Sequence, residues 1–143
     1  MANYYCAARS NYFKIGRPKD FMEWISNMPD VVFETKEKQT NDPKDLVGMV
    51  YADNNDGAGW PTYRYDTETD EEEEIDFFFE LSQFLAPGEV AVFMETGAEN
   101  LRYLTGYACA VNDKGQYLDV NINDIYQKIA DEWGIQEIST AEY

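Results

Sequence analysis

The chain has no histidine and only two cysteines among its 143 residues. Histidine is the usual general base of enzymes and the commonest metal ligand, so its absence excludes every triad of the Ser-His type. Cys6 and Cys109 are separated by most of the chain and do not make a zinc site. No Walker, Rossmann or Gly-x-Ser-x-Gly motif occurs. The sequence therefore predicts a protein that is not an enzyme and that uses no cofactor and no metal.

Long apolar runs are also missing. No stretch approaches the length of a membrane span and no charged-then-apolar leader is present, which predicts a cytoplasmic protein without a membrane partner. Both cysteines lie in apolar, strand-like surroundings, which favours two reduced thiols in the core and leaves a disulfide between them as the alternative. The loop that starts at Asp53 fails the calcium-loop pattern because its fifth position is Gly57.

Aromatic residues, by contrast, are abundant, with 11 Tyr, 8 Phe and 3 Trp. Disordered chains are poor in aromatics, so this content, together with 44% hydrophobic residues, predicts a folded protein despite its high charge. The length fits one domain that can bury a real core. We expect a single domain over residues 1–134 and a C-terminal tail over residues 135–143.

The apolar periodicity predicts an α+β domain with a mainly antiparallel sheet, in the order β-α-β-β-α-β-β-β-α, with three helices. We expect strands at residues 3–15, interrupted at a bulge at residues 9–11, and at residues 31–35, 46–52, 89–95, 101–111 and 117–122, with helices at residues 19–27, 69–85 and 123–133. Turns are expected at residues 36–44, 53–59, 96–100 and 112–115. On the last helix, Ile125, Ile129 and Trp133 are expected to point inward.

Basic residues are scarcest where acidic residues are most frequent. The formal net charge is −17, from 28 acidic and 11 basic residues. Residues 1–50 hold seven of each, whereas residues 51–100 hold fourteen acidic residues and a single base, Arg64. A small soluble domain needs a net charge of only about 2–8 in magnitude. Self-repulsion on this scale destabilises a fold, so the concentration of charge in one third of the chain indicates a binding role.

The centre of this charge is the run at residues 66–80, which carries nine carboxylates and no base. Thr69 and Glu72 fit a capping box, and carboxylates in a first turn complement the positive end of a helix dipole. Apolar residues from Ile75 onward supply a face to bury. The run is therefore predicted to be a helix with exposed acidic first turns and a packed remainder.

An aromatic cluster directly precedes the acidic run. Packing in the core is the favoured role for these three side chains, and anchoring a binding partner is the alternative, because aromatics are enriched at binding hot spots. The candidate partner-binding residues are the nine acids and the three aromatics: Asp66, Glu68, Asp70, Glu71, Glu72, Glu73, Glu74, Asp76, Glu80, Trp60, Tyr63 and Tyr65.

In size, acidic composition and lack of catalytic residues, the chain resembles the acidic DNA-mimic proteins with which phages and plasmids inhibit restriction enzymes and CRISPR effectors. The resemblance is compositional and rests locally on residues 66–80; no family motif is matched, so no functional residue is carried over. It implies a non-enzymatic inhibitor whose partner is a basic nucleic-acid-binding protein, without direct binding of nucleic acid. Because residues 1–50 are neutral, such a mimic is expected to be one-sided.

Two other interpretations stay open. The acidic patch can steer a protein–protein contact that aromatic side chains anchor, as in an immunity-type partner. Alternatively it is a solvated acidic face with no partner, as charge runs usually are. Carboxylates three or four residues apart on a helix lie about 5–6 Å apart, which approximates a short row of phosphates and favours the mimic.

Overall fold

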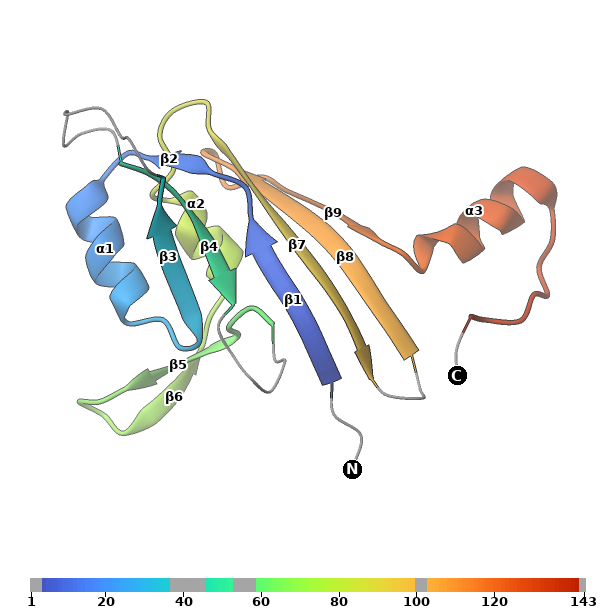
Figure 1. Ribbon diagram of the computed structural model, residues 1–143, viewed down its shortest axis with the longest axis horizontal. Coiled ribbons are helices and arrows are strands. Elements are labelled where there is room, and N and C mark those ends of the chain that lie inside the picture. The colour runs from blue at the N-terminus through green and yellow to red at the C-terminus, as the bar shows by residue number, and fades with distance from the viewer. Residues whose placement is uncertain (1–3, 37–45, 53–58, 100–102, 142–143) are drawn as a thin grey trace.

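The computed structural model describes residues 4–36, 46–52, 59–99 and 103–141, and these form nine strands and three helices (Figure 1). The strands are β1 (Tyr4–Ser10), β2 (Phe13–Ile15), β3 (Val31–Thr35), β4 (Leu46–Ala52), β5 (Tyr63–Asp66), β6 (Glu71–Glu74), β7 (Val90–Glu99), β8 (Tyr103–Asn112) and β9 (Tyr117–Asn121). The helices are α1 (Pro18–Ser26), α2 (Phe77–Ser82) and α3 (Asp124–Trp133). None of these helices is long and apolar enough to cross a membrane.

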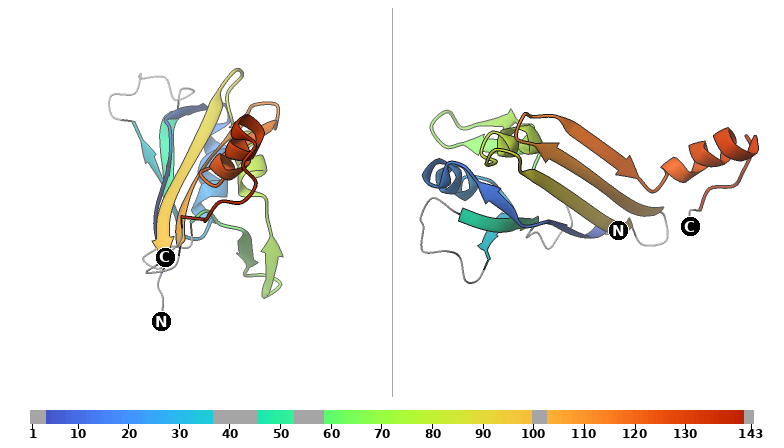
Figure 2. Two further views of the ribbon diagram at one scale, coloured as in Figure 1. Left: turned by 90° about the vertical axis from the view of Figure 1, so that its right-hand side faces the viewer. Right: turned by 90° about the horizontal axis from the view of Figure 1, so that it is seen from above.

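Seven strands form one antiparallel sheet. Its order is β2-β4-β1-β7-β8-β9, with β3 paired to β4, while β5 and β6 form a separate two-stranded sheet. The longest pairing joins β7 to β8, from Val90 opposite Asn112 to Glu99 opposite Tyr103. α1 and α2 lie on one face of the main sheet (Figure 2). The predicted α+β class, with a mainly antiparallel sheet and three helices, is confirmed.

Several predicted elements are found where local pattern placed them. α1 begins at Pro18, whose missing N–H costs nothing in a first turn. The strands β3 and β4 pair antiparallel, and β7, β8 and β9 form the predicted meander. Gly115, in the turn between β8 and β9, has the expected positive φ of 77°. The predicted turn at residues 36–44 and most of the one at 53–59 lie outside the described residues.

Three predicted elements are wrong. The strand expected at residues 3–15 is two strands, because β1 pairs with β7 and β4 whereas β2 pairs with β4 alone. The turn expected at residues 96–100 is strand as far as Glu99, since β7 continues its pairing with both β1 and β8. The helix expected at residues 69–85 is shorter and starts later: Glu71–Glu74 is the strand β6, and α2 begins only at Phe77.

The third helix also differs from expectation. None of the residues of α3 is buried, and Ile125 and Trp133, expected to point inward, are exposed. The predicted cap at Asn123 makes no side-chain hydrogen bond, whereas Gly134 ends the helix in the left-handed conformation, with φ of 69°, as predicted. The peptide N–H of Ala141 donates to the hydroxyl of Tyr126 at 2.6 Å, so the segment after α3 returns along the helix.

Apolar side chains between the main sheet and the helices α1 and α2 form the core. The ring of Phe77, on α2, is stacked between two indoles: that of Trp24 with centroids 5.5 Å apart and that of Trp60 at 5.8 Å. Phe93 of β7 meets the indole of Trp60 edge-on at 5.1 Å. Aromatic pairs contribute about 0.5–1.5 kcal/mol each beyond their buried area, so this stack joins α1, α2 and the segment before β5 to the sheet.

Replacing Phe77, the central ring of this stack, tests how much the stack contributes to the stability of the fold. We expect Phe77→Ala to lower the free energy of unfolding by about 3–5 kcal/mol, the usual cost of removing a fully buried phenylalanine. Phe79→Ala is the matched control, because the same change two residues further removes a half-exposed ring and is expected to cost about 1 kcal/mol or less. Urea denaturation of both variants gives the comparison, and equal costs would contradict the central role of Phe77.

Candidate functional site

The acidic run forms an antiparallel hairpin that stands apart from the main sheet (Figures 1 and 2). Glu74 lies opposite Tyr63 and Glu71 lies opposite Asp66. Isolated two-stranded hairpins are marginally stable in water, so the base of this one needs support. The residues on either side of the hairpin supply it, since Trp60 precedes β5, Phe77 follows β6, and their rings stack.

The tip of the hairpin is fixed by backbone hydrogen bonds around Asp66. The N–H of Glu68 donates to the Asp66 carboxylate at 2.8 Å, and the N–H of Asp70 donates to the Asp66 carbonyl at 2.9 Å. Asp70 has φ of 59°, a left-handed conformation that aspartate tolerates better than most residues. Three carboxylates, of Asp66, Glu68 and Asp70, are thereby gathered in one turn.

Arg64 attaches the hairpin to the body of the protein. Its guanidinium bridges Glu80 of α2 at 2.8 Å and Glu73 of the facing strand at 3.1 Å. The indole N–H of Trp24 also donates to the Glu80 carboxylate, at 3.1 Å. The hydrogen bond to Glu80 is the main reason that the pKa of Arg64 is raised, with Glu73 adding to it and burial opposing it. Glu80 is consequently a structural partner of two side chains rather than part of the exposed acidic surface.

The strand pairing divides the hairpin into two faces. Tyr63 and Tyr65 share one face with Glu72 and Glu74, and both tyrosines are exposed, at 53% and 54%. Arg64 lies on the other face with Glu73. Directly opposite residues lie about 4.5–5.5 Å apart at their β-carbons, so the first face alternates phenol rings and carboxylates at close range.

Most carboxylates of the hairpin remain without a cation. Within the described part of the chain, no lysine or arginine forms an ion pair with five exposed acids of the hairpin and its turn: Glu68, Asp70, Glu71, Glu72 and Glu74. Among the described residues, the one base that pairs with acids of the run is Arg64, through Glu73 and Glu80. We refer to the exposed carboxylates and tyrosines of residues 63–74 as the acidic hairpin surface.

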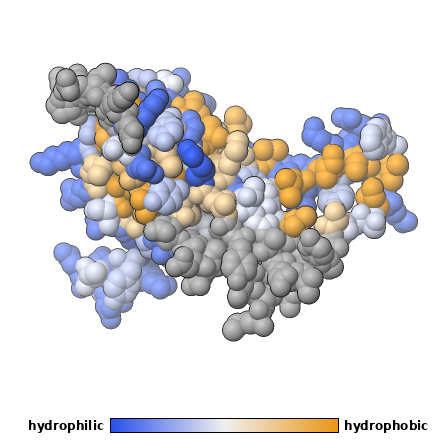
Figure 3. Space-filling model, viewed as in Figure 1, coloured by the Kyte–Doolittle hydropathy of each residue, from blue (hydrophilic) through white to orange (hydrophobic). Residues whose placement is uncertain are grey.

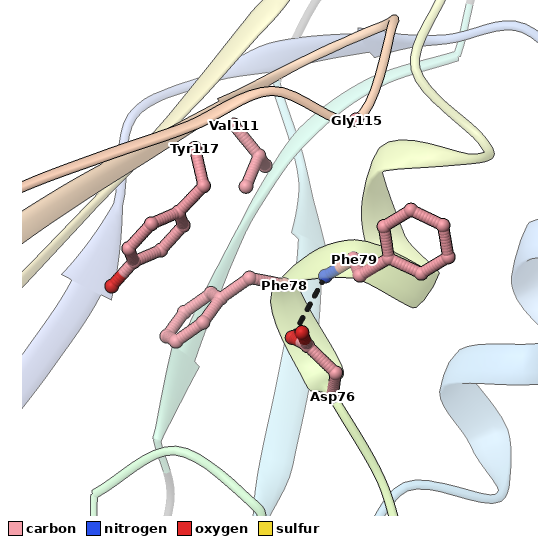
Figure 4. Close-up of a pocket in the computed structure, with 6 residues that line it drawn as sticks. All are labelled: Asp76, Phe78, Phe79, Val111, Gly115 and Tyr117. Atoms are coloured by element: carbon pink, nitrogen blue, oxygen red, sulfur yellow. Dashed lines mark hydrogen bonds between the residues drawn. The ribbon is translucent and has the colours of Figure 1, made fainter.

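Besides Glu80, two of the predicted site residues lie away from this surface, Trp60 and Asp76. Trp60 is only 7% exposed and packs in the core, and among the described residues its indole N–H has no hydrogen-bond partner. Asp76 is the N-cap of α2, where its carboxylate accepts from the N–H of Phe79 at 3.1 Å (Figure 4). The favoured prediction for the aromatic cluster, packing in the core, thus describes Trp60, whereas Tyr63 and Tyr65 are exposed.

A pocket of about 240 Å³ opens between α2 and β9, next to the hairpin. Asp76, Phe78 and Tyr117 line it, with Phe78 and Tyr117 at a ring distance of 6.1 Å (Figure 4). Behind Tyr117 lies the buried, free Cys109, and burial raises the pKa of its thiol to about 11. Burial, with the proximity of Cys109, raises the pKa of Tyr117 to about 12.

These two groups do not provide a nucleophile. At neutral pH both are protonated, and a thiol with a raised pKa lacks the thiolate that cysteine chemistry requires. Among the described residues, no group of three or more His, Cys, Asp or Glu side chains is arranged to hold a metal ion. The geometry of the hairpin and its surroundings is that of a charged surface.

No family model matches the chain, and neither a curated protein nor a solved structure matches it.

The sequence alone did not predict the role of Arg64, although it showed that Arg64 is the one base of residues 51–100. A lone base in an acidic third of a chain has many possible partners, and only the pairing of β5 with β6 selects Glu73 and Glu80.

Removing the guanidinium should loosen the hairpin without unfolding the protein. Arg64→Gln removes two charge-assisted contacts of a side chain that is only 26% exposed. We expect this loss to destabilise the hairpin by about 1–2 kcal/mol. Amide hydrogen exchange of residues 63–74 should then be about 5–30-fold faster, with exchange in β7 and β8 unchanged.

The matched control is Arg17→Gln. Arg17 pairs with the exposed Asp20 at 3.5 Å, donates to the Gln83 carbonyl at 3.1 Å and lies over the Phe84 ring. None of these contacts involves residues 63–74, so its loss is expected to leave hairpin exchange as in the wild type. Equal protection of the hairpin in the wild type and in Arg64→Gln would mean that the stacked base holds the hairpin alone.

Proposed function

We propose that the protein is a non-enzymatic inhibitor that presents the acidic hairpin surface to a basic nucleic-acid-binding protein, such as a restriction enzyme or a CRISPR effector, in place of nucleic acid. One observation carries this proposal. Four consecutive glutamates, Glu71–Glu74, form an exposed strand that is fixed to the core at its base, and within the described ranges the one cation paired with it is Arg64.

The spacing of charge along this strand supports the proposal. A β-strand rises about 3.3–3.4 Å per residue, so four successive glutamates place one negative charge at each such step, alternating between the two faces. One strand of DNA carries one negative charge per roughly 3.4 Å of helix axis. The glutamate strand therefore has about the linear charge density of a short piece of a nucleic-acid strand.

The attachment of the hairpin supports it as well. Ordering a flexible segment on binding costs affinity, and the hairpin avoids much of that cost because its base, its tip and its middle are each held by defined contacts. Its projection from the body lets it enter a cleft (Figure 2). Field lines from a basic cleft attract such a surface at long range, so association is fast and weakens with salt.

The test is a panel of restriction endonucleases and CRISPR effector complexes assayed for DNA cleavage with increasing amounts of the protein. We expect inhibition of at least one enzyme, competitive with DNA and weaker at high salt. Replacing Glu71, Glu72, Glu73 and Glu74 with glutamine is expected to raise the inhibitor concentration needed at least 100-fold, because three free charge contacts of about 1 kcal/mol each are lost and Glu73 no longer pairs with Arg64.

A control of equal charge change separates local from global electrostatics. Asp20→Asn, Glu23→Gln, Asp30→Asn and Glu34→Gln remove four exposed charges from the neutral first third of the chain. This variant should inhibit like the wild type. Inhibition that survives the glutamate-to-glutamine changes, or that both variants lose equally, would refute the role of the hairpin.

The second candidate is a protein-binding module in which aromatic side chains supply the affinity and the carboxylates only steer association. The exposed pair Tyr63 and Tyr65, on the same face as Glu72 and Glu74, is the observation that favours it. If Tyr63→Ala with Tyr65→Ala weakens binding more than the four glutamate substitutions do, and DNA does not compete, this second function is the correct one. Trp60→Ala cannot make the distinction because Trp60 belongs to the core.

A further inference from the structure

A second surface lies on the side of the main sheet that α1 and α2 leave uncovered. We call it the outer face and define it by the apolar and small residues of β7, β8 and the β9 segment that alternate with the core positions: Val90, Val92, Met94, Leu104, Gly106, Ala108, Ala110, Leu118, Val120 and Ile122. Leu118 is 76% exposed. Figure 3 looks onto this side and shows hydrophobic side chains over the sheet and along α3 in the same view.

The outer face has the shape of a shallow trough. The registers place Ala108 between Met94 and Val120 and Ala110 between Val92 and Leu118, so two small residues lie between rows of larger ones, while Ile122 packs over Gly106 at one end. Toward one end of the trough lies a hollow of about 390 Å³ whose lining includes Val90, Ala110 and Leu118. A trough of this kind accepts the apolar side of a helix.

The same chain carries an uncovered helix. α3 has apolar residues at helical spacing, Ile125, Ile129 and Trp133, yet none of its residues is buried, and Trp133 is 71% exposed. A helix of ten residues is marginal in water unless its apolar side packs against something. The helix extends past the β9 edge of the sheet, away from the core (Figure 1).

Hydrogen bonds at the start of α3 keep it off its own sheet. The N–H of Asn121 donates to the carboxylate of Asp124 at 2.8 Å, and the N–H of Asn123 donates to the side chain of Asn121 at 2.9 Å. The N–H of Ile122 still pairs with the carbonyl of Gly106 at 2.9 Å, so only one residue separates the end of sheet pairing from the helix. α3 therefore cannot turn back over its own trough without breaking these bonds.

The charge and the exposed apolar area of the outer face and of α3 indicate what covers them. The residues that define the outer face include no carboxylate, and the register places the exposed base Arg9 of β1 beside Met94 on the same side, so this surface can meet a second acidic molecule without placing carboxylates against each other. At about 150–250 Å² for a large side chain, the exposed parts of its six larger residues and of Ile125 and Trp133 add to on the order of 800 Å² per copy. A standard stable interface buries roughly 800 Å² per partner.

We propose that a second copy of the chain covers this surface, in a two-fold homodimer in which α3 of each copy lies in the trough of the other. Such a contact is isologous, because each copy supplies one helix and one trough. Trp133 is the anchor, a large aromatic side chain for the hollow at the end of the trough. This inference does not depend on the function proposed for the hairpin.

Salt dependence gives the first test. Two copies of net charge −17 repel, and salt screens that repulsion while strengthening apolar burial. Sedimentation equilibrium of the whole chain should give a mass of twice 16.5 kDa, with a dissociation constant that falls as NaCl rises from about 0.05 M to about 0.5 M. Binding of a basic target through the hairpin has the opposite dependence on salt.

Substitutions on the two halves of the contact give the second test. Trp133→Ala and Val120→Glu each remove an exposed element of the monomer, so circular dichroism should be unchanged while the dissociation constant of the dimer rises about 30-fold or more. Tyr65→Ala is the control, because it removes a similarly exposed aromatic from the hairpin and should leave dimerisation unaffected.

Three results would overturn the proposal. One is a protein that stays monomeric at about 100 μM in about 0.5 M NaCl. Another is a dimer that neither Trp133→Ala nor Val120→Glu weakens. The third is a monomer in which Trp133→Ala reduces inhibition of a target enzyme, because the trough and α3 would then belong to the contact with that target.

Discussion

The ring of Phe77 lies between the indoles of Trp24 and Trp60, and the rest of the arrangement depends on this contact. It joins α1 and α2 across the face of the main sheet, and it closes the base of the hairpin, since Trp60 and Phe77 flank its two strands. A pair of short strands rich in glutamate has little reason to form alone. Here the free energy that holds the strands together comes from aromatic burial at one end, which leaves the other end free to carry charge.

Arg64 shows how sparingly that charge is neutralised. Its guanidinium pairs with Glu80 of α2 and with Glu73 of the facing strand, and within the described residues no base pairs with the other exposed acids of the hairpin. A second base nearby would stabilise the hairpin but reduce the negative potential on which the proposed contact with a basic protein depends. The outer face differs from the hairpin, since it concentrates apolar area and the charge beside Met94 is a base, Arg9. The two contacts proposed for these surfaces would respond to salt in opposite directions.

The parts of the fold that follow from neighbouring residues could be predicted from the sequence: α1, the β3–β4 hairpin and the β7–β9 meander. The acidic run could not, because its capping-box pattern is local, whereas the strand it forms depends on pairing with β5 and on Arg64 reaching α2. Like charges four residues apart also disfavour a helix there. For α3, periodicity showed that an apolar side exists but not what covers it. The acidic site was found by composition, and its tyrosines were separated from Trp60 only by the structure.

The hairpin shares no strand with the main sheet, and this independence has a consequence for how the surface can vary. Adding two residues to each of its strands lengthens the ribbon by about 6–7 Å and keeps every side chain on its original face. No register in the seven-stranded sheet shifts, and the stacked base is untouched. The reach of the acidic hairpin can therefore change without any change in the seven-stranded sheet that carries it.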